Sequence, residues 1–173
     1  MITALIIVVL LVAAFLGYVA TRPNAFRIQR ATRVKAAPES LYPLISDMKK
    51  FNTWNPFAKA DPDAALTYSG PASGKGASYG WASRKLGVGR MEIVEATPSS
   101  RVVAKLDFVK PFEAHNIVEF TLEPKDDSTD VVWAMHGPMP FMSKLMTVFF
   151  NQDRMVGGEF EKGLANMKAA AET

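Results

Sequence analysis

The sequence predicts an α+β domain that follows a single N-terminal transmembrane helix. Three observations lead to this prediction: an uncharged apolar run at the N-terminus, a succession of short alternating strands in the middle, and an apolar stripe with helical spacing near the C-terminus. The 173 residues suffice for one domain of ordinary size plus an appendage. We therefore expect one hydrophobic core and one function.

The N-terminal run extends from Ile2 to Ala20 without a charged residue. A helix of this length spans about 28 Å, which is close to the hydrocarbon thickness of a bilayer. A cleaved signal sequence is the alternative, but it needs a basic segment in front, a shorter apolar stretch and a small-residue cleavage site. No Lys or Arg precedes the run. Residues 1–21 are therefore predicted to be a retained transmembrane anchor.

Basic residues follow the anchor, and no acidic residue precedes Glu39. They are Arg22, Arg27, Arg30, Arg33 and Lys35. The positive-inside rule then predicts a single-pass protein of the cell inner membrane with its domain in the cytoplasm. The cluster explains part of the net charge of +3, so a nucleic-acid partner is not expected. Two interpretations stay open: simple control of topology, or attraction to anionic membrane lipid at about 1 kcal/mol per residue.

Residues 22–25 are predicted to form a juxtamembrane linker, and residues 26–173 the domain. Apolar and polar residues alternate with a period of two over residues 26–36, which predicts a strand. Pro38 suits the first turn of a helix, and a second helix is expected over residues 49–54. Six further strands are then expected, over 66–70, 77–83, 90–96, 101–108, 113–123 and 130–136. Their close spacing favours an antiparallel meander.

The C-terminal stretch from Phe141 to Ala171 is expected to form one long helix. Its apolar stripe consists of Leu145, Phe149, Val156, Phe160, Leu164 and Met167. The pair Gly157-Gly158 interrupts this helix, so we expect either a kink or a close packing contact there. The apolar segment at the start of this helix, residues 139–150, is interpreted either as a cover over a cavity or as a lid that dips into the membrane.

The sequence resembles the polyketide cyclase/dehydrase-like branch of the SRPBCC superfamily, which also contains START lipid-transfer domains. Three stretches carry the resemblance: APESLYPLISDMKKFNTWNPF (residues 37–57), VVWAMHG (131–137) and DRMVGGEFEKGLANMKAAAE (153–172). The resemblance implies a helix-grip fold, in which a curved antiparallel sheet wraps around a long C-terminal helix. It also implies an apolar cavity between sheet and helix. Activity does not follow, because this scaffold serves carriers, cyclases and regulators alike.

The preferred interpretation is membrane-tethered binding or transfer of a hydrophobic small molecule, such as a lipid, an isoprenoid or a polyketide-like compound. The aromatic and methionine side chains expected to line the cavity are Trp54, Phe57, Trp81, Phe108, Phe120, Trp133, Met135, Met142, Met146 and Phe149. Two alternatives remain: a cyclase/dehydrase-type enzyme that acts on a membrane-partitioned substrate, and a regulatory interaction module with a filled core.

The sequence offers few groups for catalysis. It has no cysteine, no cluster of metal-ligand residues and no phosphate-binding loop, so no metal and no cofactor are assigned. His115 shares strand parity with Glu113 and Glu119 and is expected on the solvent side. His136, after Trp133, is the one candidate for proton transfer, and a structural histidine is its alternative. A non-enzymatic role is therefore preferred.

Overall fold

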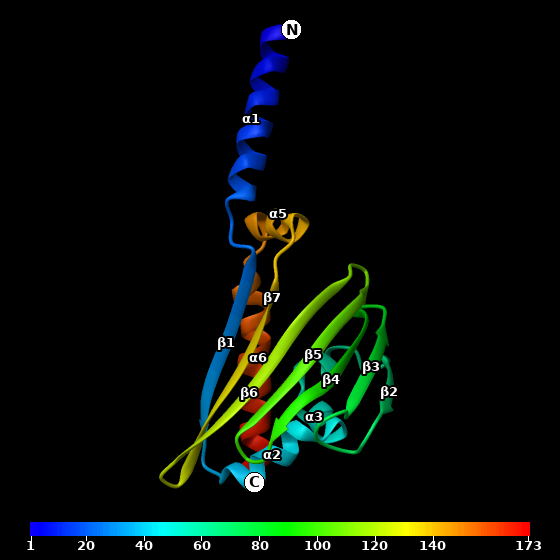
Figure 1. The fold of residues 1–173 in the computed structure, drawn as a ribbon, viewed down its shortest axis with the longest axis vertical. Coiled ribbons are helices and arrows are strands. Elements are labelled where there is room, and N and C mark those ends of the chain that lie inside the picture. The colour runs from blue at the N-terminus through cyan, green and yellow to red at the C-terminus, as the bar shows by residue number, and fades with distance from the viewer.

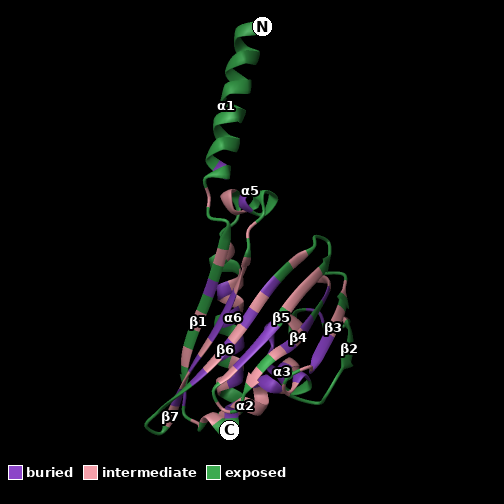
Figure 2. Ribbon diagram, in the orientation of Figure 1, coloured by how far each residue is buried: buried purple, intermediate pink, exposed green.

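A computed structural model describes residues 1–173 and confirms the predicted α+β architecture with a helix-grip arrangement (Figure 1). Helix α1 (Ile2–Ala20) projects away from the rest of the molecule. Only Val19 of this helix is buried. By length and composition α1 is able to cross a membrane, because its mean hydropathy reaches 2.8. Figure 2 shows this helix exposed along its length, in contrast to the domain.

Seven antiparallel strands form one curved sheet in the order β1-β7-β6-β5-β4-β3-β2. The strands are β1 (Ala25–Val34), β2 (Ala65–Ser69), β3 (Ser78–Ser83), β4 (Gly87–Thr97), β5 (Arg101–Lys110), β6 (Ala114–Lys125) and β7 (Ser128–Pro138). Strands β2 to β7 follow one another as the predicted meander. The last strand, β7, pairs with the first strand, β1, and this pairing brings the end of β7 beside the start of β1.

Three short helices cover part of the concave face: α2 (Pro38–Ser46), α3 (Met48–Trp54) and α4 (Pro56–Ala60). Asp47 caps α3 by accepting hydrogen bonds from the backbone N–H groups of Lys49 and Lys50. The side chain of Asn55 accepts from the N–H of Phe57 and caps α4. These caps satisfy N–H groups that a helix start leaves without partners.

The C-terminal stretch forms two helices, so the prediction of one helix is wrong. Helix α5 (Phe141–Phe149) ends at Phe150, and α6 (Gln152–Ala171) begins after Asn151. The Asn151 side chain accepts a hydrogen bond of 2.9 Å from the N–H of Arg154, which fixes the start of α6. Helix α6 then runs along the concave face of the sheet, while α5 lies across the end of the domain next to α1 (Figure 1).

Helix α6 continues through Gly157-Gly158, and a close packing contact is present at Gly157. The guanidinium of Arg30 lies where a Cβ on Gly157 would stand. Its Nε lies 2.7 Å from a carboxylate oxygen of Glu161, and its Nη2 lies 3.0 Å from one of Asp153. These hydrogen bonds raise the pKa of Arg30, and the bond from Arg30 lowers the pKa of Asp153. The contact fastens β1 to α6.

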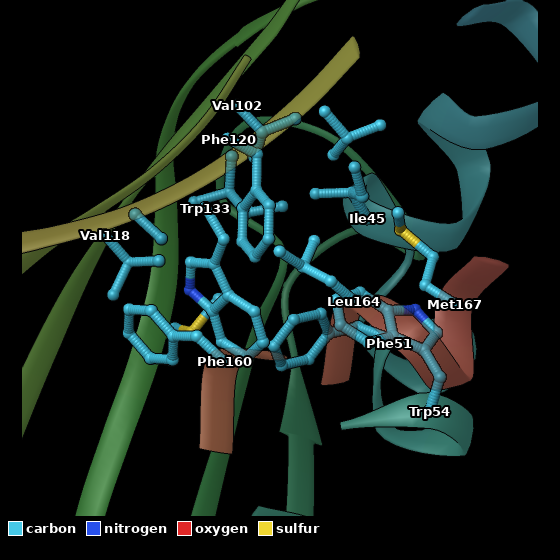
Figure 3. Packing of buried hydrophobic residues seen from close by; sticks show 14 of the residues in the cluster. Ile45, Phe51, Trp54, Val102, Val118, Phe120, Trp133, Phe160, Leu164 and Met167 are labelled. Carbon is cyan, nitrogen blue, oxygen red and sulfur yellow. The ribbon is translucent and has the colours of Figure 1, made fainter. Parts of the chain in front are cut away.

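Aromatic side chains dominate the core between the sheet and the helices (Figure 3). The indole of Trp133 on β7 stacks on the ring of Phe160 on α6, with centroids 4.2 Å apart and planes inclined by 9°. Gly163, also on α6, allows this approach, because a Cβ there would lie 2.6 Å from Trp133 Cζ3 and 2.9 Å from Pro56 Cδ. The helix, the sheet and α4 therefore meet at one glycine.

We predict that Gly163→Ala destabilises the protein by about 1–3 kcal/mol, because its methyl group overpacks the contact with Trp133 and Pro56. Gly158→Ala is the matched control on the same helix. Nothing lies within 4 Å of its Cβ position, so removing a helical glycine should stabilise the protein by about 1 kcal/mol. Urea unfolding of the two variants measures both values. Equal effects of the two substitutions would contradict the proposed packing.

Candidate functional site

An apolar cavity of about 200 Å³ lies between the sheet, α4 and the first half of α6. Of its 17 lining residues, 16 are hydrophobic, and Asn55 is the exception. Seven aromatic residues contribute to the wall: Phe51, Phe57, Tyr79, Trp81, Phe108, Trp133 and Phe160. A curved sheet and one helix leave space between them, and in this protein side chains do not fill it completely.

Half of the predicted ligand residues line this cavity. They are Phe57, Trp81, Phe108, Trp133 and Met135. They come from α4, β3, β5 and β7, so strands distant in the sequence supply one wall. The edge of the Trp81 indole faces the ring of Phe108, with centroids 5.6 Å apart. The strand parity that predicted them holds at each of these strand positions.

Trp54 and Phe120 lie beside the cavity in the solid part of the core and do not line it. Both are only 1% exposed. Trp54 donates its indole N–H to the carbonyl oxygen of Leu44 at 2.8 Å. Phe120 packs edge-on against Phe51 and Trp54, with centroid distances of 6.1 Å in each case. Both point inward as predicted, but their rings pack on each other and on Phe51, so they do not border open space.

Met142, Met146 and Phe149 lie on α5 and also stay outside the cavity lining. They are 60%, 48% and 67% exposed, respectively. As the first turns of one long helix they would have faced the sheet. The break at Phe150 turns α5 away from the sheet and toward α1.

The structure adds lining residues that the sequence reasoning did not select, notably Tyr79. Its ring is 6% exposed, and its hydroxyl oxygen accepts a hydrogen bond of 3.3 Å from Asn55 Nδ2. Burial raises the pKa of Tyr79 far above its usual value, so the hydroxyl stays protonated at neutral pH. Ala77, Tyr79 and Trp81 alternate along β3, and this pattern could have placed Tyr79 beside Trp81.

One polar atom of a cavity-lining residue has no partner. Trp133 is 3% exposed, and its Nε1 is the one buried side-chain nitrogen or oxygen without a hydrogen bond. Figure 3 shows this nitrogen on the side of the indole that faces Val118, another lining residue. A buried donor left unpaired costs about 1–3 kcal/mol, and native proteins retain few of them. A residue of the cavity wall therefore carries an unpaired N–H donor that is covered by apolar surroundings.

Neither histidine belongs to the cavity lining. His136 pairs in register with Arg27 and Ile117 and alternates with Met135, so it lies on the opposite face of the sheet. His115 is exposed, and its Nδ1 lies 2.7 Å from a carboxylate oxygen of Asp107. That hydrogen bond raises the pKa of His115. No carboxylate or imidazole lines the cavity, which leaves the Tyr79 hydroxyl as its titratable group.

These features define a helix-grip domain with an internal apolar cavity and a buried donor. The chain belongs to the family described as polyketide cyclase / dehydrase and lipid transport, whose model matches residues 25–172. No curated protein matches it.

Solved structures with low sequence identity share the fold. A Chromobacterium violaceum protein is 17% identical and aligns over 87% of this chain and 99% of its own, with a TM-score of 0.60. A Thermobifida fusca protein is 20% identical, with coverages of 82% and 90% and a TM-score of 0.60. The Aha1 dimer from Colwellia psychrerythraea is 18% identical, with coverages of 85% and 96% and a TM-score of 0.57.

The positions of Phe108 and Phe120 give a paired prediction about the cavity. Phe120→Ala should cost about 3–5 kcal/mol of stability, because the ring is fully packed. Phe108→Ala should cost less than about 2 kcal/mol, because the ring is half-buried beside open space. It should also change the affinity for an apolar probe such as 2-ethylnaphthalene. Calorimetric titration and urea unfolding measure both effects. Unchanged probe binding in Phe108→Ala would contradict the assigned cavity wall.

Proposed function

We infer that this protein binds an apolar small molecule with one acceptor oxygen, and that α1 tethers it to the membrane from which the ligand comes. The unpaired Nε1–H of Trp133, a residue that lines an otherwise apolar cavity, is the observation that carries the inference. The arrangement supports a carrier or presenting role, because the wall holds and orients a ligand but supplies no base. Family membership agrees with binding of a hydrophobic ligand in general.

Cavity size and wall chemistry narrow the class of ligand. An apolar cavity of about 150 Å³ already holds benzene, so about 200 Å³ accommodates a substituted ring or a short branched chain. Aromatic side chains offer it faces and edges, and Met135 adapts to its irregular shape. A carbonyl or ether oxygen would complete the hydrogen bonding of Trp133. The protonated Tyr79 hydroxyl provides a second donor, since its oxygen accepts a hydrogen bond from Asn55 and its own hydrogen stays available.

Tethering follows in this proposal from α1 and the residues that come after it. Residues 1–21 act as a retained anchor, residues 22–25 as a linker, and residues 26–173 as the ligand-binding domain. The linker is short enough to keep the cavity close to the bilayer. The basic residues from Arg22 to Lys35 favour the cytoplasmic side of an inner membrane. An apolar ligand dissolves in the bilayer, so a tethered site meets it at high local concentration.

The donor can be tested with two probes of nearly equal shape, 2-acetylnaphthalene and 2-ethylnaphthalene. The native protein should prefer the ketone by roughly 2- to 12-fold, the value of one neutral hydrogen bond. Trp133→Phe keeps an aromatic ring but removes the N–H, so it should abolish this preference while both probes still bind. Calorimetric titration of the detergent-solubilised chain measures the two affinities.

Trp54→Phe is the matched control for this experiment. It removes an indole N–H that already donates to Leu44 and lies outside the cavity lining. It should reduce stability and leave the preference for the ketone unchanged. If Trp133→Phe retains the full preference, the proposed anchor for the ligand is refuted. If neither probe binds the native protein, the binding function itself is refuted.

The tether makes a separate prediction. After washing with alkaline carbonate the protein should remain in the membrane pellet, because a helix that spans the bilayer resists this treatment. Its N-terminal sequence should still contain Ile2, and an alkaline phosphatase fused after Thr173 should be inactive. Release by carbonate, or a mature chain that begins after Ala20, would exclude the anchor. High phosphatase activity would reverse the topology.

A further inference from the structure

Helix α5 shows an inverted distribution of polar and apolar side chains. Its outward face is apolar, with Phe141, Met142, Met146 and Phe149 all between 45% and 67% exposed. Its one charged residue, Lys144, is only 7% exposed. A surface helix in water normally has the opposite pattern, with charged residues outside. The pattern of α5 suits an apolar environment on its outer side.

Lys144 fastens α5 to the end of α1. Its Nζ donates to the side-chain oxygen of Asn24 at 2.6 Å and to the carbonyl oxygen of Ala20 at 3.3 Å. The second bond satisfies a carbonyl that the C-terminus of α1 would otherwise leave free, and a positive charge is favourable at that end. The position of α5 relative to α1 is therefore set by specific contacts.

A second contact sets the depth of α5. The ring of Phe149 packs against Phe15 of α1, with centroids 6.3 Å apart. Phe15 precedes the end of α1 at Ala20, and at a rise of 1.5 Å per residue it lies about 7–8 Å inside the bilayer edge of a spanning α1. Amphipathic helices that lie in the interface are buried about 5–10 Å. Phe149 reaches the same depth.

The hairpin between β5 and β6 points in the same direction (Figure 1). Its tip carries Val109, which is 59% exposed, and Phe112, which is 75% exposed. Ile117, near the start of β6, pairs with His136, near the end of β7. The start of β6, and with it the hairpin tip, therefore lies beside the end of β7, where α5 follows. Two separate apolar surfaces thus occur at the end of the domain that bears α1.

We propose that α5 and the β5–β6 tip lie in the membrane interface as a second membrane contact beside α1. The lipid bilayer covers their apolar side chains. The half-buried cavity residues Leu86, Phe108 and Val156 lie at this end of the domain, next to the start of β4, the end of β5 and the start of α6. The proposal rests on the tether of the proposed function. It adds that the domain is docked in one orientation and does not swing on its linker.

The absence of cysteine makes a direct test possible. Single-cysteine variants Met146→Cys and Phe112→Cys carry the environment-sensitive fluorophore NBD, and Ala170→Cys at the exposed end of α6 is the water-facing control. Val9→Cys reports on α1. Each full-length protein is reconstituted into vesicles of phosphatidylcholine and phosphatidylglycerol. Quenching is measured with iodide in the aqueous phase and with nitroxide-labelled acyl chains in the bilayer. All substituted side chains are exposed, so folding should be preserved.

We expect the probes at 146 and 112 to be quenched by nitroxide lipid and several-fold less by iodide than the probe at 170. One outcome would overturn this contact and leave the anchor intact. In it, iodide quenches the probe at 146 or 112 as strongly as the probe at 170, while nitroxide lipid still quenches the probe of Val9→Cys. Shielding from both quenchers would also overturn it, because it would mean that a second copy of the chain covers these surfaces. Without lipid quenching at position 9, the anchor fails and this contact with it. Ligand affinity in detergent stays independent of all these outcomes.

Discussion

The stacked pair of Trp133 and Phe160 joins the sheet to the long helix and divides the interior of the domain. On one side of the pair, Trp54 and Phe120 pack into a solid aromatic core with Phe51, which also reaches the cavity wall. On the other side the space remains open as the cavity. Gly163 permits the close approach, since any larger residue would push the indole away from the helix. Core and cavity therefore depend on the same contact.

This arrangement explains how a donor can remain unpaired in a well-packed interior. The indole of Trp133 is held by the stack on one face and by Phe120 at 5.1 Å, so it cannot turn to find an acceptor. The fold bears the cost of a buried N–H that has no partner. In the proposed function, a ligand oxygen would recover that cost on binding. Affinity and orientation would then come from the same atom, while the aromatic wall would contribute apolar contact.

Much of the fold could be predicted from the sequence because alternation along a strand is a local signal. The strand predicted over 101–108 is observed at Arg101–Lys110, and that over 130–136 at Ser128–Pro138. The same alternation placed Phe108 and Trp133 on the concave face. The break between α5 and α6 escaped prediction, because Phe149 and Val156 continue one helical stripe across it. Asn151 was the available signal, because asparagine is favoured just before a helix, and in the structure it caps the start of α6.

The site was harder to predict than the fold for a related reason. Periodicity tells which side chains point inward, but not which neighbouring element fills the space before them. Trp54 and Phe120 point inward and pack on each other in the solid core, whereas Trp81 and Phe108 point inward, pack on each other and also border the cavity. Met142 and Met146 belong to an apolar face that the sequence showed, yet the direction of that face depends on the contact of Lys144 with α1. Such contacts link residues far apart in the chain.

The central claim is that the cavity holds an apolar molecule whose oxygen accepts the hydrogen bond from Trp133. Native mass spectrometry of the full-length protein, released gently from its own membrane, tests this most directly. We predict a bound species of one defined mass that is soluble in organic solvent and contains oxygen. It should be absent from Leu106→Trp, a variant in which a larger side chain fills the cavity that Leu106 lines. An empty native protein, or the same adduct in both proteins, would contradict the account.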